Sequence, residues 1–157
     1  MEATTIETIK ALTPAFLGVV GLAITLIFSI ANKNLSHQKM EKELFSEFNK
    51  RYDIFNDSLN LLDSITSLQQ LKETDSLIEK KSMHNLLIDY FNLCSEQYYW
   101  YKKKRIKKLL WKSWHSGMMH YYTKYPVVSE LWEKEIKDEG YKSYYLKAGK
   151  NFFKETY

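Results

Sequence analysis

Residues 11–31 read ALTPAFLGVVGLAITLIFSIA, and this stretch decides how the rest of the chain is organised. It contains no charged side chain. A helix rises about 1.5 Å per residue, so the stretch spans roughly 31 Å, the thickness of a bilayer's hydrocarbon core. Pro14 is expected in the first turn of this helix, where a missing backbone N–H costs no hydrogen bond. The sequence therefore predicts one transmembrane helix near the N-terminus.

The main alternative is a cleaved signal peptide. Ser29-Ile30-Ala31 resembles the small-x-small pattern of a cleavage site. The residues before the apolar run oppose this interpretation, because Glu2 and Glu7 outnumber Lys10 where a signal peptide would begin with positive charge. The apolar run is also longer than the central segment of a typical signal peptide. We therefore favour a retained anchor.

Basic side chains are distributed unevenly around the apolar run. Lys33, Lys39 and Lys42 follow it, whereas only Lys10 precedes it. By the positive-inside rule, the C-terminal part then lies in the cytoplasm and the chain crosses the membrane once. The expected parts are a short extracytoplasmic N-terminus (1–10), a transmembrane helix (11–31) and a cytoplasmic helical domain (32–157).

Small residues recur along the predicted anchor at steps of three or four. Ala15, Gly18, Gly21 and Thr25 form this pattern, which allows two membrane helices to approach closely. We therefore treat self-association of the anchor as one hypothesis. The alternative is that such residues are simply common in membrane helices. Because residues 11–31 hold no ionisable side chain, an ion pathway through this helix is disfavoured.

The chain after residue 31 shows helical periodicity and no strand pattern. Apolar residues recur every three or four positions in four stretches: 40–65, 83–101, 110–122 and 127–136. The tail from Tyr141 to Phe153 is expected to form one more short helix. The chain has 12 Tyr, 8 Phe and 4 Trp, and most of these rings must fill the space between helices. The predicted fold class is all-α, with the transmembrane helix followed by an antiparallel bundle of about four to five helices.

Candidate catalytic and metal-binding residues are few. His115 and His120 are five positions apart, about 140° around a helix, so they do not face one metal ion together. Cys94 is the only cysteine, and its apolar surroundings favour burial over reactivity. The chain has no Gly-x-Ser-x-Gly motif and no Gly-rich phosphate loop. We predict no cofactor, no metal and no enzymatic activity.

One polar stripe interrupts the second periodic stretch. Asn85, Asp89, Asn92 and Glu96 fall on one face of a helix. Glu96 lies beside several aromatic residues, and its candidate partners are Arg51 and a tyrosine hydroxyl. A solvated carboxylate or a structural ion pair is the favoured interpretation over a catalytic one.

The most unusual feature is YYWYKKKRIKK at residues 98–108, in which four aromatic residues precede a basic run. The basic residues of this run are Lys102, Lys103, Lys104, Arg105, Lys107 and Lys108. Three interpretations remain open: an ordinary solvated turn, contact with anionic lipid, or binding to nucleic acid by charge and base stacking. The adjacent anchor favours lipid over nucleic acid.

Three stretches carry a resemblance to known sequences: FNKRYDIF (48–55), YFNLCSEQYYWYKKKRI (90–106) and WKSWHSGM (111–118), with Pro126 and Trp132 following. Together they resemble a group of uncharacterised bacterial single-pass membrane proteins with a small cytoplasmic helical domain. The resemblance implies this architecture and a bacterial inner membrane location, and it implies no activity. The turn after Tyr101 often holds a glycine in that group, whereas here it reads Lys103-Lys104.

The expected function is a membrane-anchored, non-enzymatic interaction module, such as a sensor or effector in phage defence. The expected partners are membrane lipid and either another protein or a second copy of this chain. Nucleic acid is disfavoured, and the sequence indicates no small-molecule substrate. Two alternatives remain: a membrane-perturbing oligomer, and an enzyme with an unrecognised site near Glu96, His115 or His120.

Overall fold

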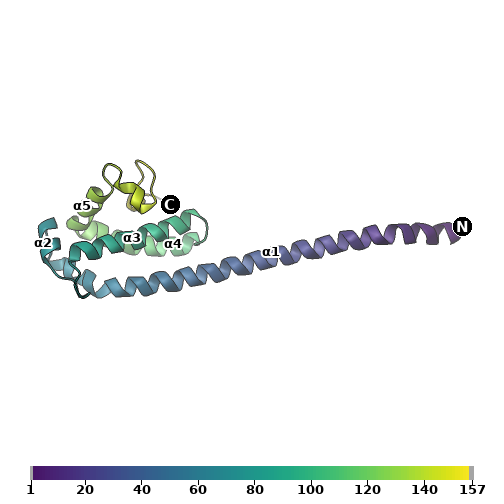
Figure 1. Cartoon of the computed structure of the whole chain (residues 1–157), viewed down its shortest axis with the longest axis horizontal. Coiled ribbons are helices and arrows are strands. Elements are labelled where there is room, and N and C mark those ends of the chain that lie inside the picture. The colour runs from purple at the N-terminus through teal and green to yellow at the C-terminus, as the bar shows by residue number, and fades with distance from the viewer. Residues whose placement is uncertain (1, 156–157) are drawn as a thin grey trace. The chain divides into compact units, whose positions relative to one another are not determined.

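The protein, described by a computed structural model for residues 2–155, is all-α as the sequence predicts (Figure 1). The side chains of residues 2–6, 9 and 11 lie outside the described part, and so does Met1 of the predicted N-terminal segment. No strand occurs among the described residues. The elements are α1 (Glu2–Leu59), η1 (Asn60–Ser64), α2 (Leu68–Glu73), α3 (Met83–Lys102), α4 (Lys108–Lys124), α5 (Pro126–Glu135), η2 (Gly140–Tyr144) and η3 (Phe152–Lys154), where η marks a 3₁₀ helix.

The chain divides into two compact units, Met1–Met40 and Glu41–Tyr157. The first unit consists of the N-terminal part of α1. Its most apolar window has a mean hydropathy of 2.2, and none of that window is buried. Large apolar side chains such as Phe16, Leu22 and Ile27 are each more than 60% exposed. By length and composition this is a helix that can cross a membrane.

The second unit is built on three long helical segments whose directions alternate. Arg51 of α1 pairs with Glu96 of α3, and Phe55 packs on Tyr90, so residue numbers rise on α1 as they fall on α3. These two helices are therefore antiparallel. Four further contacts show that α1 and α4 are parallel and that α3 and α4 are antiparallel: Phe48–Trp114, Tyr52–Tyr121, Tyr90–Tyr121 and Tyr98–Trp111.

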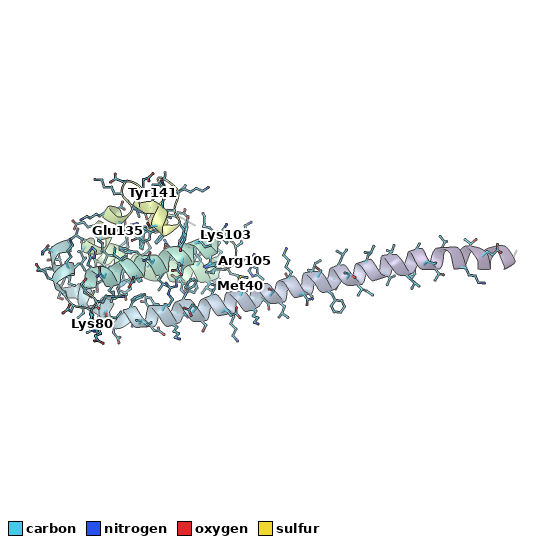
Figure 2. The ribbon with its side chains drawn as sticks, in the orientation of Figure 1. Met40, Lys80, Lys103, Arg105, Glu135 and Tyr141 are labelled. Atoms are coloured by element: carbon cyan, nitrogen blue, oxygen red, sulfur yellow. The ribbon has the colours of Figure 1, made fainter. Side chains whose placement is uncertain are left out.

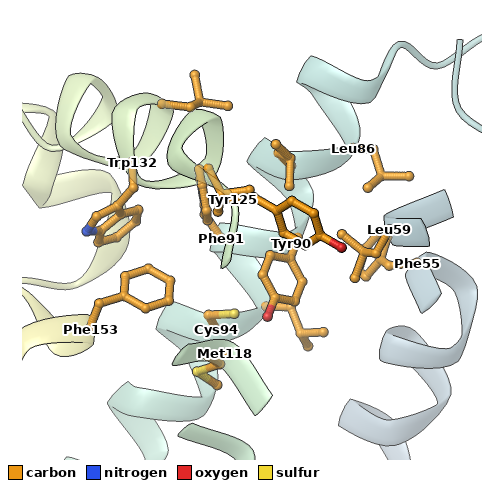
Figure 3. Close-up of a cluster of buried hydrophobic side chains, with 14 of the residues drawn as sticks. Phe55, Leu59, Leu86, Tyr90, Phe91, Cys94, Met118, Tyr125, Trp132 and Phe153 are labelled. Atoms are coloured by element: carbon orange, nitrogen blue, oxygen red, sulfur yellow. The ribbon is translucent and has the colours of Figure 1, made fainter. Parts of the chain in front are cut away.

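Aromatic rings attach α5 and the C-terminal segment to this three-helix unit. Trp132 of α5 is fully buried, and its ring lies 5.1 Å from the ring of Phe91 on α3. Phe152 and Phe153 of η3 lie 4.8 Å and 5.2 Å from the same indole. Figure 3 shows Trp132, Phe91 and Phe153 in this cluster. The tail is therefore part of the core, as its aromatic content indicates.

The structure differs from the sequence predictions at several elements, and one helix, α2 (Leu68–Glu73), lies in none of the predicted helical stretches. Pro14 lies inside α1, because the helix already begins at Glu2. The first cytoplasmic helix ends at Leu59 instead of continuing to Ile65, and its last stretch tightens into η1. The tail forms two short 3₁₀ helices in place of one α-helix, because Tyr145 and Gly149 both adopt positive φ and interrupt any longer helix.

Candidate functional site

The basic run forms the connection between α3 and α4. Lys102 ends α3 and Lys108 begins α4, so the residues between them make a tight turn. The Lys104 N–H donates to the Tyr101 carbonyl at 2.8 Å, and the Arg105 N–H donates to the Trp100 carbonyl at 3.0 Å. These two bonds form a Schellman C-cap. Its central residue, Lys104, has a φ of 57°, a conformation that glycine adopts without strain and lysine does not.

Two contacts hold the turn against the start of the bundle. Ile106 is 3% exposed and anchors the turn in the core. The Glu41 carboxylate of α1 accepts from the Lys107 backbone N–H at 2.9 Å, and it also pairs with the Lys107 ammonium at 2.9 Å. A carboxylate at this position satisfies an otherwise open donor at the N-terminus of α4. The turn is therefore fixed at the end of the bundle where α1 enters it.

The six basic side chains of the turn differ in how far they are neutralised. Besides the Lys107 pair, Lys102 lies 3.6 Å from the Glu155 carboxylate. The Lys103 ammonium lies over the Tyr99 ring at 5.4 Å from its centre, which leaves its charge intact. Within residues 2–155, Arg105 and Lys108 form no ion pair. Figure 2 shows Lys103 and Arg105 at this end of the bundle, opposite Lys80.

An exposed leucine completes this surface, which we call the basic turn surface and define as Lys102–Leu109. Leu109 lies in the first turn of α4 and is 81% exposed, more than any other large apolar residue reported for the second unit. Its chain neighbours on the N-terminal side are Lys107 and Lys108. Leu109 was not predicted as a site residue, because the apolar stripe of α4 runs through Leu110, Trp111 and Trp114. At about 100° per residue, Leu109 lies on the opposite face of the helix from that stripe. An apolar residue in this position is the sequence signal for an exposed leucine.

Arg51 and Glu96 lie together and form a bidentate ion pair. The guanidinium donates to the two carboxylate oxygens at 2.6 Å and 3.0 Å. The hydrogen bond to Glu96 and the nearby carboxylates raise the pKa of Arg51. A second ion pair, Lys81 with Asp89, shares the same open groove of about 500 Å³. Positive and negative groups are matched in this groove, so the arrangement is that of a structural network.

The small residues of the predicted anchor lie on one face of α1. At about 100° per residue, Ala15, Gly18, Gly21 and Thr25 fall within an arc of about 120°. A Cβ added at Gly18 or Gly21 would meet nothing within 4 Å. The Thr25 hydroxyl donates to the Gly21 carbonyl at 2.8 Å, so its polar group is satisfied within the helix. This face therefore presents a smooth, shallow surface.

The remaining candidate residues for chemistry are dispersed. His115 is buried, and its Nε2 lies 2.9 Å from the Phe152 carbonyl oxygen, whereas His120 is exposed one turn further along α4. Burial lowers the pKa of His115. Cys94 is fully buried beside Tyr90, and burial raises the pKa of its thiol. Within the described part of the chain, no group of three His, Cys, Asp or Glu side chains is arranged to hold a metal ion.

Comparisons with protein-family models, with curated proteins and with solved structures found no match to this chain. The basic turn surface combines unneutralised charge with an exposed apolar side chain.

Proposed function

We propose that this protein is a membrane-anchored, non-enzymatic interaction module whose helical bundle docks on anionic lipid through the basic turn surface. The observation that carries the proposal is Leu109, which is 81% exposed among basic residues at the tip of the bundle. An apolar side chain surrounded by cations matches the boundary between lipid headgroups and acyl chains. In water alone, the same leucine has no favourable contact to make.

The basic side chains of this surface attract anionic lipid, and the strength of this attraction can be estimated. Each Lys or Arg close to an anionic leaflet contributes about 1 kcal/mol. Lys103, Arg105 and Lys108 retain their charge, because none of them faces a carboxylate in the described part of the chain. The electrostatic attraction and the insertion of one leucine together give only a weak contact between the bundle and the membrane. A tether to the same membrane strengthens this contact, because it raises the effective concentration of the bundle at the lipid surface.

The chain supplies that tether. Glu41, which contacts the turn through Lys107, is the tenth residue after Ala31, the end of the apolar run. Even fully extended, ten residues reach no more than about 36 Å. The proposal therefore requires no diffusion of the bundle from solution, since a short stretch of chain joins the bundle to the apolar run.

We place the protein in a bacterial inner membrane with the bundle on the cytoplasmic side. The support is the excess of Lys33, Lys39 and Lys42 over Lys10 around the apolar run, together with the resemblance to bacterial single-pass proteins. Anionic lipid on the cytoplasmic face is what the basic turn surface would meet there.

The aromatic residues before the turn favour lipid over nucleic acid. Base stacking requires free ring faces. Tyr98 is 5% exposed, and Tyr101 is stacked on Trp111 with ring centres 5.2 Å apart. Tyr99 packs on Trp100 and on Tyr145. These rings are engaged in the bundle, so the run keeps its charge but loses the stacking platform that nucleic acid would use.

Spin labels in the full chain, reconstituted in nanodiscs, test the proposal. Cys94 is 1% exposed, so a Leu109→Cys variant is labelled selectively at position 109. We expect the label to be accessible to oxygen and protected from a water-soluble nickel chelate when the nanodisc is rich in phosphatidylglycerol. In nanodiscs of phosphatidylcholine alone, the same label should be exposed to water, because the attraction is electrostatic.

A label at Leu77→Cys is the matched control. Leu77 is 67% exposed and bonds through its backbone N–H to Ser58, at the opposite end of the bundle. This label should stay in water in both lipid mixtures. Reversing two charges, with Arg105→Glu and Lys108→Glu, should return the label at position 109 to water. A label at 109 that is water-exposed in both lipid mixtures would show that the bundle does not dock in this way.

The proposal includes self-association of the anchor through Ala15, Gly18, Gly21 and Thr25. The support is that these residues share one face and that Gly18 and Gly21 have open space around them. Crosslinking in intact membranes distinguishes a partner protein from a second copy of this chain. Dimers that disappear with Gly18→Leu and Gly21→Leu would identify this face, whereas unchanged dimers would exclude it.

A further inference from the structure

A second feature lies inside the bundle, away from the basic turn surface. A pocket of about 230 Å³ is formed where α1, α3 and α4 meet. Its lining includes Tyr52 and Tyr90, and also Cys94 and Met118, which Figure 3 shows between α3 and α4. No charged side chain lines it within the described part of the chain. The pocket is therefore mainly apolar and aromatic, as ligand sites usually are.

Each of the three helices also contributes one polar side chain to the lining. These are Asn49 from α1, Gln97 from α3 and Ser113 from α4. Gln97 is 95% buried, and it lines the pocket from α3. A primary amide in the wall of a pocket offers an N–H and a C=O to a ligand.

We infer that this pocket binds a small, neutral, flat aromatic compound that carries an amide-like donor and acceptor. Its neutrality follows from the uncharged lining. Its aromatic character follows from the Tyr52, Tyr90 and Trp114 rings in the lining, since rings prefer to pack on rings. The donor and acceptor follow from the primary amide of Gln97, which offers both N–H and C=O.

The volume sets the size of the ligand. An apolar cavity of about 150 Å³ holds benzene, with its six carbons. At the same density, 230 Å³ holds about nine or ten non-hydrogen atoms. This is the size of a two-ring compound such as oxindole, whose lactam presents one N–H and one C=O side by side.

A larger side chain in place of Gly117 can fill the pocket. It lines the pocket from α4, and a Cβ added to it would meet nothing within 4 Å. Gly117→Leu would therefore extend a side chain into open space without a clash at the backbone. Ser116→Leu adds the same side chain one residue earlier, at an exposed position that does not line the pocket. The two variants form a matched pair.

Methyl NMR of the full chain in detergent micelles, labelled with [¹³C-methyl]methionine, tests this inference. Oxindole is titrated as the probe, and indane is the hydrocarbon control of similar size. We expect the Met118 methyl signal to shift saturably, with a dissociation constant on the order of 100 µM. Met83 is buried at the start of α3 and does not line the pocket, so its signal should stay in place and report that the bundle is folded.

Three variants decide the outcome. Gly117→Leu should abolish the Met118 shift, and Ser116→Leu should preserve it. Gln97→Leu should weaken oxindole binding about tenfold and leave indane binding nearly unchanged, because only oxindole bonds the amide. Equal shifts in Gly117→Leu and the parent chain would mean partition into micelles and would overturn the inference. Equal oxindole affinity in Gln97→Leu, with Met83 unshifted, would overturn the amide's role.

Discussion

At the scale of single residues, Arg51 and Glu96 show how a charged pair is accommodated at the edge of an aromatic core. Their side chains are 31% and 30% exposed, so water still reaches them and the desolvation cost is moderate. The two parallel N–H···O bonds hold α1 and α3 at one register. The pair therefore stabilises the packing of these helices and leaves no unpaired charge for chemistry.

Glu96→Gln should lower the free energy of unfolding by about 1 kcal/mol, because it turns one charge-assisted bond into a contact between two donors. Chemical denaturation of the full chain in a mild detergent measures this change. Glu79→Gln is the control, since Glu79 and its partner Lys80 are nearly fully exposed, and it should have no effect. Equal effects of the two variants would contradict a stabilising role for the Arg51–Glu96 pair.

At the scale of elements, the α3–α4 turn keeps a lysine in a conformation that glycine adopts more easily. Lys104 has a φ of 57°, at the position of the C-cap where glycine is common. The strain costs roughly 1–2 kcal/mol, and a charge at the lipid-facing turn is the gain that our proposal assigns to it. Stability and membrane contact are thus opposed at one residue.

Lys104→Gly should stabilise the bundle by about 1 kcal/mol and weaken its contact with anionic nanodiscs about fivefold. Lys103→Gly is the matched control. Lys103 has a φ of −76°, so glycine relieves no strain there, and this variant should lose the charge without any gain in stability. Denaturation and the spin-label assay measure the two effects separately. A Lys104→Gly variant with unchanged membrane contact would contradict the proposed role of this charge.

At the scale of the whole molecule, the two units differ in how their apolar residues are used. The first unit exposes its apolar side chains, whereas the reported core of the second begins at Phe48 and continues to Phe153. A surface of exposed Leu, Ile and Phe is typical of a helix that can cross a membrane. The second unit buries its own apolar side chains, so we expect it to fold without the first.

A chain of residues 41–157 should therefore fold in water without detergent, with a melting temperature within a few degrees of the full chain. Thermal unfolding followed by circular dichroism measures this. A chain of residues 50–157 is the control, since it lacks Glu41 and Phe48, and it should melt far lower because a phenylalanine costs about 3–5 kcal/mol when removed from a core. Aggregation of residues 41–157 would show that the units depend on one another.

The helical class, the apolar N-terminal segment and most helix ends could be predicted from local features of the sequence. Charge-free length, helical periodicity and Pro126 are local signals, and a local signal needs no knowledge of the fold. The break after Leu59, the 3₁₀ tail and the left-handed Lys104 were not predicted. Each depends on contacts with residues distant in sequence, or on a backbone conformation that the residue type does not favour.

The tertiary structure alone decided which polar groups meet. Periodicity placed Glu96 on a face of α3, but two candidate partners remained until the register of α1 against α3 was known. The pocket at Gln97 could not be derived from the sequence, because it depends on how three helices pack together. The sequence gives the type of each side chain. Burial depends on tertiary packing, because packing brings together residues that are far apart in the sequence.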